Sequence, residues 1–176
     1  TNRLLVRNEN LSGEAKGSGQ SGGSGRRSVV KVKVGTQSGP HSDAKKINRI
    51  AKIHKFSVTL RLDANRAWEI GQFEAFAEGL EPGVLELIEY IEEPLKSPLN
   101  VESFERARKC IPYALDETLA IKNEAEVLLP KCDAVVIKPS IVGGYERAKE
   151  VMKGSGKVCV LSSMFEGEVG MAHLAI

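Results

Sequence analysis

The sequence of 176 residues has few cysteines, little net charge and no long apolar runs. Its three cysteines, Cys110, Cys132 and Cys159, form neither an even set nor a C-x-x-C pair. A disulfide framework and a zinc site are therefore disfavoured, and a reducing compartment is indicated. The 25 Lys and Arg nearly balance the 23 Asp and Glu, so no strong field recruits nucleic acid or an anionic membrane. The apolar runs are also too short to cross a bilayer.

The sequence begins at Thr1 without an initiator methionine and without the pattern of a secretory signal. We therefore expect it to be a piece of a longer protein. A bacterial source would place the protein in the cytoplasm, and a photosynthetic eukaryote would place it in the plastid.

A stretch rich in glycine and serine divides the chain. Ten of the fourteen residues 12–25 are Gly or Ser, and such a stretch cannot bury enough apolar surface to offset the entropy lost on ordering. We expect a flexible linker or insertion over residues 12–27. Residues 1–11 are then a first strand or an extension, and residues 28–176 form one domain.

From Ser28 onward, strand-like runs alternate with segments of helical period. The strand-like runs are 28–34, 56–63, 87–92, 112–116, 133–138 and 157–163. Apolar residues between the runs recur at helical spacing, as in Ala44, Ile47, Ile50 and Ala51, and in Trp68, Phe73, Phe76, Ala77 and Leu80. Ser42 and Asp43 mark the expected start of the first helix.

The alternation of strands and helices predicts an α/β fold with a parallel sheet. Six strands are visible after the linker, whereas a complete eight-stranded barrel takes about 250 residues. The sheet is therefore either open and doubly wound or part of a barrel that is cut short at both ends.

Five successive strand-like runs end in a charged residue. These residues are Lys33, Asp63, Glu92, Asp116 and Lys138, at separations of 30, 29, 24 and 22 residues. Each separation is about one βα unit, and the carboxyl ends of parallel strands open on one face of the fold. We therefore expect the five side chains to converge on one mouth.

Three of these residues are carboxylates. Asp63, Glu92 and Asp116 would repel one another in a partly desolvated cavity, so they should hold either protons or a cation. An all-oxygen set without His or Cys suits a hard ion and favours Mg²⁺ over zinc.

Lysines flank the carboxylates on both sides. Lys31 and Lys33 share one face of their strand because side chains alternate. The neighbouring like charge disfavours the ammonium form of Lys33, which suits a general base. Lys138 arrives from the opposite flank.

The same alternation selects among the other polar residues at the strand ends. Arg61 shares a face with Asp63 and is expected to point into the cavity. In the YIEEP run, Glu92 lies on the inner face, while Glu93 points the other way and is interpreted as a supporting partner.

Six short motifs together resemble, in order and spacing, the barrel domain of the enolase superfamily, and most closely the o-succinylbenzoate synthase family. They are KVKVG (31–35), LRLDANRAW (60–68), YIEEPL (90–95), ALDETL (114–119), VIKPSIVGG (136–144) and LSSMFEGEVG (161–170). The resemblance covers residues 28–176 and implies a partial (β/α)₇β barrel of the TIM type. It also implies that the three carboxylates bind Mg²⁺ and that the lysines Lys33 and Lys138 face each other across the substrate.

The resemblance implies a dehydration of a small carboxylate, a cyclohexadiene that carries a hydroxyl and a succinyl chain. Lys33 would take the proton alpha to the carboxylate, and Lys138 would stabilise the negative charge that develops near Mg²⁺. Further residues would bind the substrate or support the site: Lys31, Arg61, Asn65, Ser162 and Ser163. The two serines are equally compatible with ordinary helix capping. No segment resembles the capping domain that such enzymes carry, and we expect that domain in the longer chain.

Other functions stay open. Lysines on both flanks also suit the proton transfer of N-acylamino acid racemases and dipeptide epimerases, and a segment kept as an inactive scaffold is a further alternative. A doubly wound Mg²⁺ phosphatase or receiver sheet gives no role to two flanking lysines. A His–Asp base pair is disfavoured because no histidine ends a strand-like run.

Overall fold

The computed structural model describes residues 4–6, 28–96 and 99–162, and these contain seven strands in one parallel sheet. The strands are β1 (Leu4–Val6), β2 (Ser28–Lys33), β3 (Val58–Asp63), β4 (Ile88–Glu92), β5 (Tyr113–Leu115), β6 (Ala134–Ile137) and β7 (Val158–Leu161). Their spatial order is β1-β7-β6-β5-β4-β3-β2. The linker expected over residues 12–27 lies outside the described residues.

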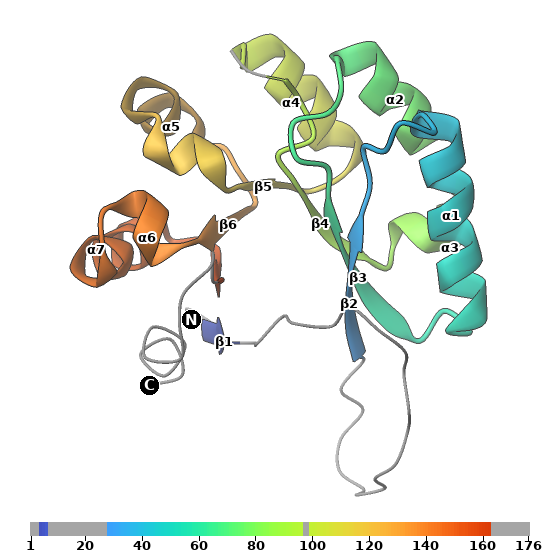
Figure 1. Cartoon of the computed structure of the whole chain (residues 1–176), viewed down its shortest axis with the longest axis horizontal. Helices are drawn as coiled ribbons and strands as arrows, with labels where there is room; N and C mark the ends of the chain where they lie inside the picture. The colour runs from blue at the N-terminus through green and yellow to red at the C-terminus, as the bar shows by residue number, and fades with distance from the viewer. Residues whose placement is uncertain (1–3, 7–27, 97–98, 163–176) are drawn as a thin grey trace, which may run out of the picture.

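Helices follow the strands and lie around the outer side of the curled sheet (Figure 1). They are α1 (Pro40–Ile53), α2 (Ile70–Glu78), α3 (Pro82–Leu85), α4 (Val101–Cys110), the 3₁₀ helix η1 (Glu117–Ala120), α5 (Lys122–Leu128), α6 (Pro139–Val142) and α7 (Tyr145–Ser155). None of the helices within the described ranges is long and apolar enough to cross a bilayer.

The strand order decides between the two expected architectures. From β2 to β7 each strand pairs with the next one along the chain. A doubly wound sheet instead reverses its strand order and carries helices on both faces. The sheet is therefore part of a TIM-like barrel, as the resemblance to the enolase superfamily implies.

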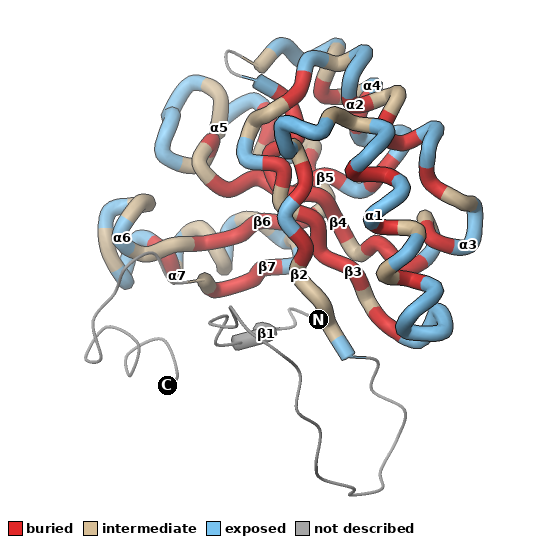
Figure 2. Tube along the Cα trace, turned by 45° about the vertical axis from the view of Figure 1, so that its right-hand side comes forward, coloured by how far each residue is buried: buried red, intermediate tan, exposed pale blue. Residues whose placement is uncertain are grey.

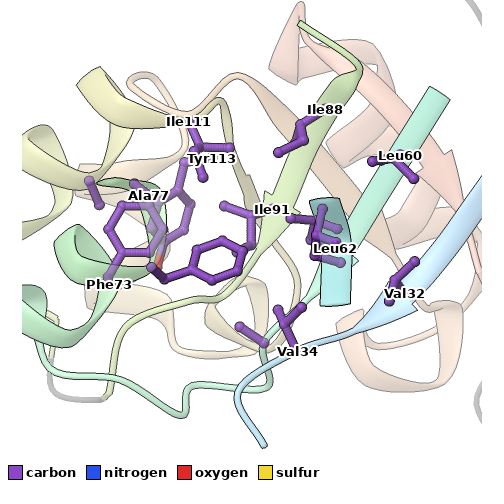
Figure 3. Packing of buried hydrophobic residues seen from close by; sticks show 14 of the residues in the cluster. Val32, Val34, Leu60, Leu62, Phe73, Ala77, Ile88, Ile91, Ile111 and Tyr113 are labelled. Carbon is purple, nitrogen blue, oxygen red and sulfur yellow. The ribbon is translucent and has the colours of Figure 1, made fainter. Parts of the chain in front are cut away.

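The main core fills the space between the sheet and the helices. Leu60 and Leu62 of β3 and Ile91 of β4 are fully buried in one cluster with Phe73 of α2 (Figure 3). Phe76 of α2 is fully buried in the same cluster. Figure 2 shows strands β3 to β7 buried along most of their length, with exposed residues on the helices. Apolar residues at alternate strand positions form this outer face.

A second, smaller cluster of buried residues lies on the inner face of the sheet. Its members come from four adjacent strands: Tyr90, Ala114, Ala134, Val136 and Val160. Because side chains alternate along a strand, the residues two positions further on continue the same face. In this way Glu92 follows Tyr90, Asp116 follows Ala114, and Lys138 follows Val136. The inner cluster therefore lies directly below the predicted site.

Two expectations about the helices were wrong. Helix α1 begins at Pro40, before Ser42 and Asp43, because proline is well suited to the first turn of a helix. Asp43 lies buried in that first turn, where its carboxylate accepts hydrogen bonds from the amide and hydroxyl of Thr36. Trp68 does not belong to a helix: it precedes α2 and forms a parallel bridge with Leu95.

Candidate active site at the carboxyl ends of the strands

The pairing of the strands aligns the predicted charges. Lys33 of β2 pairs with Asp63 of β3, and Asp63 pairs with Glu92 of β4. Asp116 follows β5 as the N-cap of η1, and Lys138 follows β6 as the N-cap of α6. The five residues therefore lie at the same end of five adjacent strands.

Lys31 makes the close contacts to the first two carboxylates. Its Nζ lies 2.9 Å from Oε2 of Glu92 and 3.5 Å from Oδ2 of Asp63. Lys33, at the end of the strand, is exposed, and its carbonyl oxygen accepts a hydrogen bond from Nζ of Lys46. The two lysines of the K-x-K motif thus have different surroundings, one beside the carboxylates and one open to solvent.

Lys138 pairs with the third carboxylate. Its Nζ lies 2.5 Å from Oδ2 of Asp116 and 3.9 Å from Oε1 of Glu117. Burial alone would lower the pKa of Lys138, but the hydrogen bond and the charge of Asp116 outweigh it and raise the pKa. Lys138 is therefore held as an ammonium ion.

Two of the three carboxylic acids have pKa values above their usual range. Burial raises the pKa of Glu92 to about 7, although Lys31 opposes the shift, and the charges of Asp63 and Asp116 add to it. Burial likewise raises the pKa of Asp116 to about 6, against the opposing effect of Lys138. Removing a carboxylate from water disfavours its charged form, so ionising both residues without a nearby cation is unfavourable.

One carboxylate oxygen at these strand ends is suited to a hard divalent cation. Within the described ranges, no group of three or more His, Cys, Asp or Glu side chains is arranged to hold a metal ion, and lysines make the close contacts instead. However, Oδ1 of Asp116 is buried and has no hydrogen-bond partner among the described residues. A buried carboxylate oxygen without a donor is suited to a cation, and the all-oxygen donor set suits Mg²⁺.

The structure places the expected supporting residues in different surroundings. Arg61 is 1% exposed, its Nε donates to Oε2 of Glu89 at 2.8 Å, and its guanidinium lies 5.3 Å from the ring centre of Tyr90. Arg61 therefore lies on the same face of the sheet as Tyr90. Asn65 is exposed in the loop after β3, with a left-handed backbone (φ 53°).

The two serines of the last strand-like run fall at the limit of the described structure. Ser162 is half-buried just after β7, and its amide donates to the carbonyl oxygen of Ile137 at 2.9 Å. Ser163 lies outside the described residues, so its role stays a prediction.

A buried network behind the carboxylates was only partly anticipated. Glu93 is 1% exposed and accepts hydrogen bonds from the amides of Asp116 and Thr118 and from the hydroxyl of Thr118. Arg66 donates to the same hydroxyl. The alternation along β4 indicated a supporting role for Glu93, whereas no sequence signal indicated Thr118 or Arg66.

Comparison with known proteins places this arrangement in a family. A family model described as enolase C-terminal domain-like matches residues 23–174. This chain belongs to the enolase superfamily. An o-succinylbenzoate synthase from Yersinia pseudotuberculosis serotype O:3 (strain YPIII) is 34% identical over 151 residues, which cover 84% of this chain and 46% of that protein. The chain thus spans about half the length of this curated relative.

Solved structures of the enolase superfamily share the fold. A dipeptide epimerase from Cytophaga hutchinsonii, complexed with Mg and the dipeptide D-Ala-L-Val, has a TM-score of 0.69 and 27% identity, over 84% of this chain and 41% of that one. An o-succinylbenzoate synthase from Thermosynechococcus elongatus BP-1, complexed with Mg in the active site, has a TM-score of 0.67 and 23% identity, over 84% of this chain and 48% of that one. At 23% identity, the second likeness concerns the fold alone.

Proposed function

We propose that this chain is the barrel part of a Mg²⁺-dependent dehydratase of the o-succinylbenzoate synthase type. The observation that carries the proposal is the row of Lys33, Asp63, Glu92, Asp116 and Lys138 at the ends of five adjacent strands. The identity to an o-succinylbenzoate synthase over most of the chain supports dehydration as the reaction.

Each side chain then has a defined task. Asp63, Glu92 and Asp116 would hold Mg²⁺, which when bound would neutralise negative charge on the substrate carboxylate. Lys33, exposed at the open end of the strand, takes the proton alpha to that carboxylate as the general base. It then returns this proton to the hydroxyl as the C–O bond breaks, so that water leaves and the ring becomes aromatic.

Lys138 acts through its charge. Because Asp116 holds it as an ammonium ion, it stabilises the negative charge on the opposite flank without accepting a proton. Lys31 offsets the charge of Asp63 and Glu92 from the side of β2.

A second candidate function is the epimerisation of a dipeptide. The likeness to the Cytophaga epimerase favours it, at 27% identity over 84% of this chain. An epimerase needs an acid on the face opposite the base, and Lys138 has the position for that role. The ammonium group of Lys138, hydrogen-bonded to Asp116, suits either role, so it is the likeness to the curated synthase that favours dehydration.

Three further parts of the proposal concern the whole protein. The substrate is a small carboxylate, and a capping domain outside this segment closes the mouth, because water must be excluded from the reaction. A bacterial protein of this kind works in the cytoplasm, and one from a photosynthetic eukaryote works in the plastid.

Product analysis tests the function. The longest reading frame that encodes this segment is expressed, so that any neighbouring domain is present, and is incubated with Mg²⁺ and either substrate. We expect the hydroxycyclohexadiene carboxylate to yield an aromatic product, followed by ultraviolet absorbance. Epimerised dipeptide without aromatic product would establish the second candidate instead. Turnover of neither substrate would favour an inactive scaffold.

A further inference from the structure

Glu93 lies at the junction of three loops, and each of these loops follows a strand that leads to one of the three carboxylates. Its Oε1 accepts the amides of Asp116 and Thr118 at 2.8 and 2.9 Å, and its Oε2 accepts the hydroxyl of Thr118 at 2.9 Å. From the loop after β3, Nε of Arg66 lies 3.4 Å from Oε2 of Glu93, and Nη2 donates to the hydroxyl of Thr118.

The hydrogen bonds to Glu93 replace the usual capping role of Asp116 at the start of η1. An aspartate at an N-cap normally turns its own carboxylate back to accept the amide of the second or third helical residue. Asp116 makes no such bond, because Glu93 already accepts the amide of Thr118, the second residue of η1. The carboxylate of Asp116 therefore extends to Lys138 and keeps its second oxygen without a donor among the described residues.

The backbone around Glu93 is held in an uncommon conformation. Its φ is 38°, in the left-handed region that residues other than glycine rarely adopt. Two main-chain hydrogen bonds fix it there: its amide donates to the carbonyl of Ala114 at 3.1 Å, and its carbonyl accepts the amide of Arg66 at 2.6 Å. Such conformations persist only where the surroundings determine them, and they concentrate at functional sites.

We propose that Glu93 is the positioning residue for Asp116: it caps η1 in place of Asp116 and so leaves the Asp116 carboxylate facing the cation site. The metal-binding part of this inference rests on the proposed function, whereas the capping part does not. Without Glu93, the amide of Thr118 would be left without its acceptor, and the carboxylate of Asp116 is the nearest replacement in sequence.

Two substitutions of Glu93 test the proposal. In Glu93→Ala we expect the carboxylate of Asp116 to rotate onto the amide of Thr118 in a crystal structure. The dissociation constant for Mg²⁺ alone, measured by calorimetry, should rise by about ten- to a hundredfold, as is usual when a residue that orients a metal ligand is removed. Glu93→Gln keeps an oxygen that can accept both amides, so it should restore the position of Asp116 and most of the affinity. If Glu93→Ala fails to fold, Glu93→Asp replaces it, because that carboxylate is one methylene too short to reach both amides.

Asp43 provides a matched control for the loss of a buried carboxylate. It is 2% exposed and accepts the amide and hydroxyl of Thr36, as Glu93 does with Thr118, but it touches none of the three carboxylates of the site. Asp43→Ala should therefore lower the melting temperature while leaving the affinity for Mg²⁺ unchanged.

A double-mutant cycle separates positioning from a general loss of stability. If Glu93 acts through Asp116, then Glu93→Ala should cost no further Mg²⁺ affinity in an Asp116→Asn background. Fully additive losses, or an Asp116 that keeps its conformation in Glu93→Ala, would overturn the proposal. A wild-type chain that binds no Mg²⁺ would refute the proposed function alone, since the crystal structure of the variant still tests the capping role.

Discussion

Glu92 and Asp116 hold their protons more tightly than ordinary carboxylic acids because the inner face of the sheet buries them. Their pKa values are raised to about 7 and about 6. Near neutral pH, Glu92 is therefore only partly ionised and Asp116 is mostly ionised, and a bound cation would favour the ionised form of both. This property connects the fold with the metal binding that we propose.

The affinity for Mg²⁺ should consequently depend on pH. Binding needs both carboxylates ionised, so protons must leave, and the apparent affinity should fall as the pH is lowered from 8 to 6. Calorimetry at pH 6.5 in two buffers with different ionisation enthalpies measures the released protons. An affinity that is the same at pH 8 and pH 6 would contradict the raised pKa values.

The two outer lysines should be needed for turnover but not for metal binding. Lys33→Ala and Lys138→Ala each remove a group that acts on the substrate, and we expect the turnover rate to fall by about 10²- to 10⁴-fold. Affinity for Mg²⁺ should stay largely intact. The matched control is Lys131→Ala, which removes only a surface pair with Glu105. Substantial activity in either site variant would remove the role assigned to that lysine.

The sequence predicted the row of charges because each one directly ends an apolar run, and alternation along a strand is a strong geometric rule. It also indicated that Glu93 points away from Glu92. The partners of Glu93 were not predictable, because Thr118 and Arg66 reach it through loops whose conformation leaves no periodic pattern in the sequence.

Among the secondary-structure elements, helix α4 contributes one fully buried aromatic ring to the core. Phe104 of α4 is fully buried and lies 4.6 Å, ring centre to ring centre, from Tyr113 of β5. Phe104→Ala should lower the free energy of unfolding by about 3 to 5 kcal/mol, measured by urea denaturation. Arg106→Ala, which breaks only an exposed pair with Glu74 of α2, should cost no more than about 1 kcal/mol. Equal losses in the two variants would contradict this picture of the packing.

The elements themselves were mostly predictable, but their ends were not. The apolar period located α1 and α2 correctly, while Pro40 rather than Ser42 begins α1. Trp68 fits the helical spacing of α2, yet it lies outside the helix because it pairs with Leu95 and stacks on Phe76 at 4.8 Å. Periodicity indicates which side chains are buried together. It does not indicate whether the backbone at each of those positions is helical.

For the molecule as a whole, the consecutive parallel strands explain why residues far apart in sequence form one site. From β2 to β6, each βα unit adds one strand to the sheet and one charged residue at its carboxyl end. The sequence left an open sheet and a partial barrel as alternatives, because strand order depends on tertiary packing and not on local pattern. The observed order is that of a barrel, and the family comparison agrees with it.

The central claim is that Asp63, Glu92 and Asp116 bind one shared cation. Titrating the chain with Mg²⁺ by calorimetry at pH 8, beside the variant Asp116→Asn, tests it most directly. We expect one Mg²⁺ per chain in the wild type, a rise in its melting temperature with added Mg²⁺, and an affinity at least about tenfold weaker in the variant. No binding to the wild type, or equal affinity in the two proteins, would contradict the claim.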